Sequence, residues 1–205
     1  MIIKHWQAGI FGANNYLVIN ESRKEAALID CSEYTEQIEK ELNNYGAVLK
    51  YILLTHGHFD HVMGINETKR RYPNAKVFAH FSDKSLILGI NEFMQKYGMF
   101  TESLEVPIID EYVQEGSISG NQIKIIHTPG HTRGSVCYLI DDNLFSGDTI
   151  FLEAVGRTDL DGGNFEDIKS NIENKIFTLD ENIKIFPGHG DFTSVKHEKE
   201  NNRFI

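Results

Sequence analysis

Four apolar runs in this chain are each followed, within a few residues, by histidine or aspartate. THGHFDH follows the run Tyr51–Leu54, and HTPGHT begins as the run Ile123–Ile126 ends. SGDT and PGHG follow Leu144-Phe145 and Ile183–Phe186 in the same way. Short apolar runs bounded by glycine or proline are typical of buried strands. The pattern therefore predicts rigid sheets, and loops at one edge of a sheet usually carry the functional groups.

The segment Thr55–His61 contains three histidines and one aspartate. Crowded imidazoles would repel one another on protonation, and a metal ion prevents this because it binds the deprotonated ring. A histidine pair in one turn is by itself a weak signal, since loops are solvated and polar. Because four strand ends share the pattern, we predict that their side chains belong to one metal centre.

The composition is that of an ordinary globular chain of 205 residues, 40% hydrophobic and 24% charged. We expect one domain over residues 1–205. The net charge of −10 disfavours nucleic acid as a partner, since a phosphate backbone requires a basic surface. The N-terminal residues contain no apolar segment of signal-peptide length, and no run approaches the roughly 20 residues of a membrane span. We therefore expect a soluble, cytoplasmic protein that does not act at a membrane.

The two cysteines, Cys31 and Cys137, are too few for a disulfide framework. Neither belongs to a CxxC pair. We expect each to be a small buried apolar residue and not a nucleophile or a metal ligand.

Strand-like and helix-like segments alternate along the chain. The predicted strands are Ile2–Trp6, Tyr16–Asn20, Ala26–Ile29, Tyr51–Leu54, Lys76–Ala79, Ile123–His127, Val136–Ile140, Asn143–Phe145 and Ile183–Phe186. Apolar spacing of three and four residues predicts helices between an N-cap at Ser32 and Gly46, from near Val62 to before Pro73, over Ser82–Tyr97, and over Phe165–Ile176 after Asn164. This order fits two mixed sheets with helices outside them, although the periodicity also permits one doubly wound sheet.

The ligand motifs resemble the signature of the metallo-β-lactamase-fold hydrolases. Their HxHxDH motif stands here as His56, His58, Asp60 and His61, and the match continues in order through His131, Asp148 and His189. GANNYLV and the AALID run ending on Asp30 are also similar to the family's first strands and first motif. The resemblance spans nearly the whole chain. It implies an α/β fold, a four-layer αββα sandwich with the site along one edge.

The resemblance also implies two divalent metal ions, with zinc expected first and iron or manganese as alternatives. It assigns His56, His58 and His131 to the first ion, Asp60, His61 and His189 to the second, and Asp148 as a bridge between them. Three imidazoles leave a zinc ion one open position for water, as a catalytic site requires. Two ions roughly 3.5–4 Å apart can lower the pKa of a shared water to about 7. Asp60 is assigned a catalytic role because its carboxylate serves the second ion.

The segment VGRTDLDGG narrows the resemblance to a subgroup. It is similar to GRTDLPGG in short bacterial glyoxalase II-like, or hydroxyacylglutathione hydrolase-like, enzymes, with Asp161 in place of the proline. Arg157 in this segment could bind a substrate carboxylate, because a guanidinium makes bidentate contacts. The alternative is a structural arginine that pairs with Asp159 or Asp161. We expect the chain to lack the helical domain that helps full-length glyoxalase II enzymes bind glutathione. The identity of the thiol half of the substrate is therefore not predicted.

The leading hypothesis is a binuclear metal-dependent hydrolase of small-molecule thioesters. A GRTD segment also occurs in persulfide dioxygenases, relatives that hold one iron, so a mononuclear iron oxidoreductase is the second hypothesis. A third is a non-catalytic metal-binding module. It fits least well, because every ligand position of the family signature is present.

Overall fold

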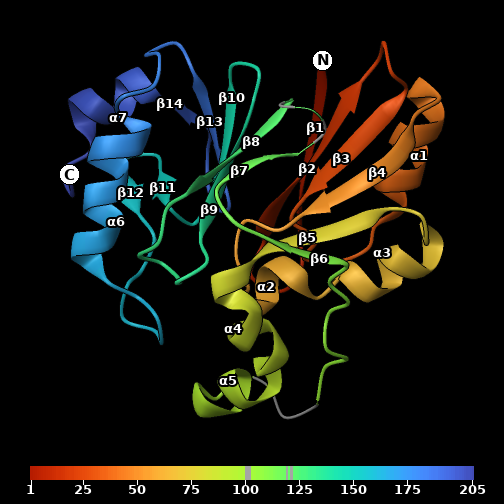
Figure 1. The fold of residues 1–205 in the computed structure, drawn as a ribbon, viewed down its shortest axis with the longest axis horizontal. Coiled ribbons are helices and arrows are strands. Elements are labelled where there is room, and N and C mark those ends of the chain that lie inside the picture. The colour runs from red at the N-terminus through yellow and green to blue at the C-terminus, as the bar shows by residue number, and fades with distance from the viewer. Residues whose placement is uncertain (100–102, 119, 121) are drawn as a thin grey trace. The chain divides into compact units, whose positions relative to one another are not determined.

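The computed structural model describes residues 1–99, 103–118, 120 and 122–205, which form two compact units (Figure 1). The first unit comprises Met1–Ala79 and Lys84–Tyr112, and the second comprises His80–Asp83 and Val113–Ile205. Each unit is built around one six-stranded sheet. The prediction of two mixed sheets is thereby confirmed, and the doubly wound alternative is wrong. The prediction of a single domain stays a prediction.

The first sheet has the strand order β1-β2-β3-β4-β5-β6. Its strands are β1 (Ile2–Ala8), β2 (Ala13–Asn20), β3 (Glu25–Ile29), β4 (Val48–Leu53), β5 (Lys76–His80) and β6 (Glu111–Val113). Helices α1 (Glu36–Tyr45) and α3 (Ile65–Arg71) contribute Ile38, Leu42 and Ile65 to one core cluster with the strand residues Leu28 and Ile52. The pairs β3-β4 and β4-β5 are parallel, so their carboxyl ends lie at the same edge of the sheet.

The second sheet has the strand order β14-β13-β10-β9-β8-β7. Its strands are β7 (Gly116–Ile118), β8 (Ile123–His127), β9 (Val136–Ile140), β10 (Asn143–Gly147), β13 (Lys184–Pro187) and β14 (Thr193–Ser194), and β11 (Ile150–Phe151) pairs separately with β12 (Ala154–Val155). Helix α6 (Phe165–Asn171) and the following π-helical turn Ile172–Ile176 place Ile168, Ile172 and Ile176 in a core cluster with Ile126 and Ile185. Helix α7 (Val195–Asn201) follows β14. The pair β10-β13 is parallel.

Glycine precedes a helix in two of the predicted segments. The helix expected from near Val62 begins at Ile65 as α3, after a separate short helix α2 (Phe59–Val62), and Gly64 between them lies against the backbone of Glu33, where a Cβ would come 2.6 Å from the carbonyl carbon. The segment Ser82–Tyr97 is split at Gly89 into α4 (Lys84–Leu88) and α5 (Ile90–Lys96). Both glycines cap the following helix, so the apolar stripe continues although the helix does not.

The predicted N-cap at Ser32 is wrong. Helix α1 begins after Thr35, and the backbone N–H of Ser32 donates instead to the side chain of Asn15 (2.8 Å). The C-terminal prediction is confirmed, since Gly46 adopts a left-handed φ of 58° and closes the helix. Asn164 is the N-cap of α6, where its side chain accepts from the Asp167 N–H.

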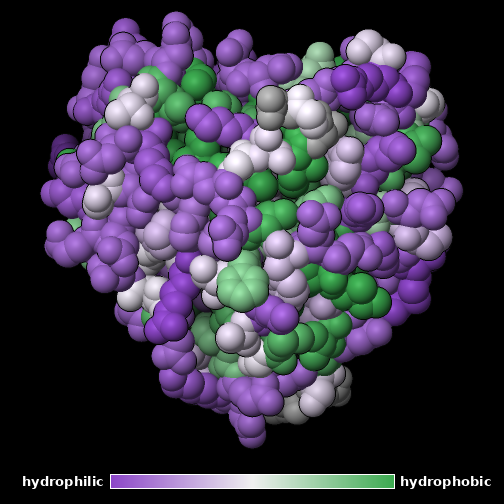
Figure 2. Space-filling view, in the orientation of Figure 1, coloured by the Kyte–Doolittle hydropathy of each residue, from purple (hydrophilic) through white to green (hydrophobic). Residues whose placement is uncertain are grey.

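No helix among the described residues is long and apolar enough to cross a membrane. Figure 2 shows hydrophilic residues over most of the viewed face, with hydrophobic residues between them.

The segment His80–Asp83 leaves β5 and packs within the second unit. The buried ring of His80 stacks on His127, with centroids 3.9 Å apart and planes 20° apart. Nδ1 of His80 accepts from the Ser82 N–H (3.3 Å), and Nε2 of His127 donates to the carbonyl of Arg133 (2.9 Å). Both rings of the stack belong to the second unit.

The stability of the protein should fall as the pH drops from about 6.5 towards about 4. Burial, followed by the positive charge of His127, lowers the pKa of His80 to about 4, and Glu115 opposes this. As the pH falls, His80 is therefore protonated in the unfolded chain before it is protonated in the folded protein. The stability that the neutral ring contributes above pH 6.5 is lost as the pH falls towards about 4. One pKa unit corresponds to about 1.4 kcal/mol, which makes the loss roughly 2 kcal/mol after allowance for solvent screening.

Urea unfolding of the metal-free protein at about pH 7 and about pH 4.5 measures this effect. His80→Phe keeps an aromatic ring on His127 but does not titrate. The stability that this variant loses between the two pH values should therefore be about 2 kcal/mol smaller than the loss in the wild type. An identical pH dependence in both proteins would show that His80 does not contribute.

Candidate metal centre

Asp30 organises the loop that carries the HxHxDH motif in the first unit. Its carboxylate accepts from the backbone N–H of Thr55 (2.8 Å), from the Thr55 hydroxyl (2.7 Å) and from Nδ1–H of His61 (2.8 Å). Asp30 itself has a φ of 56°, in the left-handed region that residues other than glycine rarely adopt. The conformation turns the chain directly after β3, where the Asp30 N–H still donates to the carbonyl of Leu53 (3.0 Å).

These hydrogen bonds determine which nitrogen of each ring is protonated. Thr55 has one hydroxyl proton and gives it to Asp30, so Nδ1–H of His56 is the donor in its 3.1 Å contact with the Thr55 oxygen. His61 uses its own Nδ1–H on Asp30. In both rings the lone pair is therefore on Nε2, which is the form of imidazole that binds a metal ion.

Asp60 and His61 face each other across a short gap. Oδ2 of Asp60 lies 3.7 Å from Nε2 of His61, which is longer than a hydrogen bond. Two ligands of one tetrahedral zinc ion, each about 2.0–2.1 Å from it, lie roughly 3.3 Å apart. The gap is thus close to the spacing that a shared ion requires.

The remaining rings of the motif pack closely within the first unit. The ring of His56 has its centroid 4.9 Å from that of His58 and 4.2 Å from that of His61. Phe93 of α5 covers His58, at 5.2 Å between centroids. Phe93 and Met94, one helical position apart on α5, are both buried.

Asp148 and His189 follow neighbouring parallel strands in the second unit. Asp148 comes directly after β10 and His189 comes shortly after β13, and the Gly188 N–H donates to the carbonyl of Gly147 (2.8 Å). Oδ2 of Asp148 lies 3.8 Å from Nε2 of His189. The parallel pairing explains why two residues far apart in the sequence present their side chains together.

His131 lies beside the same carboxylate. Its Nε2 is 3.5 Å from Oδ2 of Asp148, and its Nδ1–H donates to the backbone carbonyl of Arg157 (2.7 Å). A carbonyl can only accept, so the proton is on Nδ1 and the lone pair on Nε2. Asp148 therefore has two metal-binding nitrogens within 3.8 Å of one oxygen, as a bridging carboxylate would.

The guanidinium of Arg157 forms a bidentate pair with Asp159. Nε and one terminal nitrogen donate to its two oxygens at 2.8 and 2.7 Å, and Arg157 lowers the pKa of Asp159 to about 2. Both side chains are more than half exposed. The pair is the structural contact that the sequence offered as an alternative.

Cys31 and Cys137 are free and buried, as predicted. Burial raises the pKa of the Cys31 thiol to about 12 and that of Cys137 to about 11. Both therefore stay protonated at neutral pH, and a thiol in that form is a poor nucleophile and a poor metal ligand.

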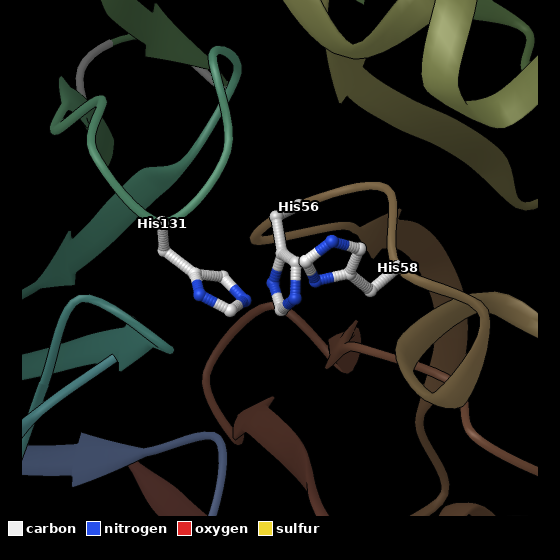
Figure 3. A group of neighbouring side chains, drawn as sticks. All are labelled: His56, His58 and His131. Carbon is white, nitrogen blue, oxygen red and sulfur yellow. The ribbon is translucent and has the colours of Figure 1, made fainter. Parts of the chain in front are cut away.

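Three groups of histidine and aspartate could each hold a metal ion, with the ligand atoms of a group within 4.8 Å of one another. The groups are His56, His58 and His131; His56, His61 and Asp148; and Asp60, His61 and His189. Figure 3 shows the first group as neighbouring side chains. All seven predicted ligands belong to these groups, and imidazole nitrogen with carboxylate oxygen is a donor set that suits zinc and iron. Their ligation of a metal stays a prediction.

Thr55 was not predicted as a functional residue, and Asp30 was predicted only as the end of a family motif. The available signal was positional, since each lies at the carboxyl end of a parallel strand, next to residues predicted as ligands.

Comparison with known proteins extends these observations to the whole chain. Residues 8–189 match the model of the metallo-beta-lactamase superfamily. Hydroxyacylglutathione hydrolase GloC of Haemophilus influenzae is 32% identical over 202 residues, which cover 93% of this chain and 92% of that protein. The similarity confirms the predicted family on nearly the full length of both chains.

Two solved structures agree in fold. TTHA1623, solved in a di-iron-bound form, has a TM-score of 0.86 and 27% identity over 98% of this chain and 100% of that one. BLEG-1, a B3 metallo-beta-lactamase, has a TM-score of 0.82 and 29% identity over 99% of both chains. The predicted α/β fold class is confirmed by this agreement together with the two sheets.

Proposed function

The chain belongs to the metallo-beta-lactamase superfamily, and we propose that it is a thioester hydrolase that uses two divalent metal ions. The superfamily and GloC support a metal-dependent hydrolase. The observation that supports the binuclear proposal is that seven side chains form three overlapping groups, which share His56 and His61, and that the all-histidine group and the group containing Asp60 have no member in common. One mononuclear site would not need the second group.

The chain's own residues prepare this site in two ways. Hydrogen bonds on Nδ1 hold His56, His61 and His131 with Nε2 available for a ligand bond. Asp60 and Asp148 supply negative charge that offsets part of the charge of two dications. When bound, the ions would supply Lewis-acid chemistry, lowering the pKa of water and polarising the scissile carbonyl.

A thioester suits a site with this donor set. A thiol leaves with a pKa near 8.5, so its departure does not require a protein group to protonate it. GloC is a hydroxyacylglutathione hydrolase by name, and hydroxyacylglutathione is a thioester. We propose the same bond type for this chain and leave its acyl and thiol halves open.

The second candidate is an iron-dependent persulfide oxidoreductase. The observation that favours it is the GRTD segment, and TTHA1623 shows that a chain of this fold can hold iron. A His-and-carboxylate site with open positions would suit iron and oxygen.

The two functions separate in one comparative assay. Metal-free protein is reconstituted with zinc, iron or manganese, and each form is given a hydroxyacyl thioester or a low-molecular-weight persulfide. We expect thiol release from the thioester in the zinc form, with no oxygen consumption. Oxygen consumption on the persulfide in the iron form, without thioester cleavage in any form, would instead establish the oxidoreductase.

We further propose that Arg157 binds a carboxylate on the thiol half of the substrate. Arg157→Ala should then lower kcat/KM about tenfold to a hundredfold on a carboxylate-bearing thioester, since a charged hydrogen bond is worth about 1.5–3 kcal/mol. The loss should nearly vanish on a thioester without the carboxylate. Lysine should restore activity only in part, because it cannot make the bidentate contact.

Asp159→Asn is the matched control, because it removes the partner that Arg157 contacts without removing the guanidinium. If Arg157 binds substrate, this variant keeps or improves the use of the charged thioester. If the Arg157–Asp159 pair is structural, both variants should lower activity on the charged and uncharged thioesters alike. Equal losses of activity on both substrates would show that Arg157 does not bind the substrate carboxylate.

A further inference from the structure

A buried aspartate contacts the loop that carries His131. Asp83 is 2% exposed and lies in the short helical turn Phe81–Asp83 of the second unit. Its Oδ2 accepts from the hydroxyl of Thr132 (2.7 Å), and its Oδ1 accepts from the backbone N–H of Gly134 (2.6 Å). One carboxylate thus binds the residue directly after His131 and the residue two positions further on.

The loop is also packed tightly on this carboxylate. A Cβ on Gly134 would lie 2.5 Å from Cγ of Asp83, so only glycine allows the backbone to approach so closely. Within the loop, the side chain of Ser135 accepts from the N–H of Thr132 (2.9 Å), and its hydroxyl lies 2.8 Å from that of Thr132. Thr132 and Ser135 are both buried. Displacement of this backbone would therefore break several hydrogen bonds together.

The imidazole ring of His131 is held by a different contact. Its Nδ1–H donates to the carbonyl of Arg157, which determines the tautomer and the rotation of the ring. That contact does not fix the His131 backbone, which the Asp83 contacts hold together with the bond from the Gly130 N–H to the Thr132 carbonyl (3.1 Å). The two sets of contacts together place Nε2 of His131 at 3.5 Å from Asp148.

We propose that Asp83 is a positioning residue for the metal centre, acting through the backbone of the loop to place His131. The inference rests on the proposed function only in that His131 binds a metal ion. Groups that support metal-binding histidines typically change metal affinity about tenfold to a hundredfold when they are removed. A buried carboxylate is also costly in a folded protein, which fits a residue retained for the geometry of a site.

The test is zinc affinity, measured by competition with a chelator, in Asp83→Ala and in the milder Asp83→Asn. Glu198→Ala is the control. Glu198 is fully buried in the same unit, and its carboxylate accepts from Glu153, Thr193 and Asn202, none of them a predicted ligand. Both alanine variants should unfold at lower urea concentration than the wild type. Only Asp83→Ala should weaken zinc binding, by about tenfold to a hundredfold in the folded protein.

A double-mutant cycle separates positioning from a general loss of structure. In a His131→Ala background, Asp83→Ala should cause no further loss of zinc affinity, because the group through which it acts is gone. If Asp83→Ala does not fold, the same comparison is made with Asp83→Asn, for which we expect a loss of at least about threefold.

Wild-type affinity in the folded Asp83 variants would overturn the proposal, as would an equal loss in Glu198→Ala or an undiminished loss in the His131→Ala background. Failure of the proposed function is distinguishable, since zinc affinity is measured without substrate. A wild-type protein that binds zinc and depends on Asp83 but cleaves no thioester would leave the inference standing and remove the thioester assignment.

Discussion

Replacing Asp148 with alanine is expected to lower kcat/KM for a thioester by about a thousandfold, or roughly 4 kcal/mol. One oxygen of this carboxylate lies 3.5 Å from Nε2 of His131 and 3.8 Å from Nε2 of His189. Without it, two imidazoles lose the negative group they share, and bound metal should be lost with activity. Initial rates and metal content of the purified variant measure both effects.

Asp142→Ala is the matched control, because Asp142 is an exposed aspartate at the opposite end of the same strand, β10. It should retain the metal content and the activity of the wild type. Activity of Asp148→Ala within about tenfold of the wild type, with metal still bound, would exclude a bridging carboxylate at this position.

Gly156→Ala should cause the second large loss, although glycine 156 has no functional group. Its Cβ would overlap the carbonyl oxygen of Asp148 and would lie 3.2 Å from Nδ1 of His131. To relieve the overlap, the backbone must move at Asp148, and the ring of His131, a second predicted ligand, must shift as well. We expect zinc affinity to fall by about a hundredfold and stability by about 1–3 kcal/mol.

Gly46→Ala provides a destabilised control without a change at the site. Gly46 has a φ of 58°, and no atom lies within 4 Å of its added Cβ, so alanine there costs backbone strain alone. Its expected cost is about 1 kcal/mol, with zinc affinity unchanged. If Gly156→Ala binds zinc as tightly as Gly46→Ala does, the loop around Gly156 does not constrain the ligands.

The sequence was a good guide to the strands because burial within a sheet is visible in a short apolar run. All nine predicted strands are present, with ends shifted by a few residues. The short strands β6, β7, β11, β12 and β14, which have two or three residues each, were missed because such segments are too short to show a period.

The helix interruptions depend on contacts between residues far apart in the sequence. Gly64 lies between α2 and α3 and approaches the backbone of Glu33, a contact that the apolar pattern on either side of it does not show. The error at Ser32 has a similar cause, since its N–H is bound by Asn15 from another strand. Neither contact can be predicted from the sequence pattern near the residue.

The candidate ligands could be predicted because a metal requires particular side chains at strand ends. The residues that position these ligands could not be predicted. Asp83 and Thr132 are separated by 49 positions, and nothing in FSD distinguishes that aspartate from a solvated one. No pattern in the sequence distinguishes Gly156 from other loop glycines either. The supporting contacts are visible only when the chain is folded.

The metal content of the protein tests the central claim most directly. Protein purified without added metal is incubated with excess zinc, iron or manganese, desalted and analysed for metal by mass spectrometry, with thioester hydrolysis measured on the same samples. We predict two ions per chain, with activity rising as the second ion binds, because the seven side chains include two candidate groups with no residue in common. A content that stays at one ion per chain with every metal, at full activity, would contradict the binuclear centre.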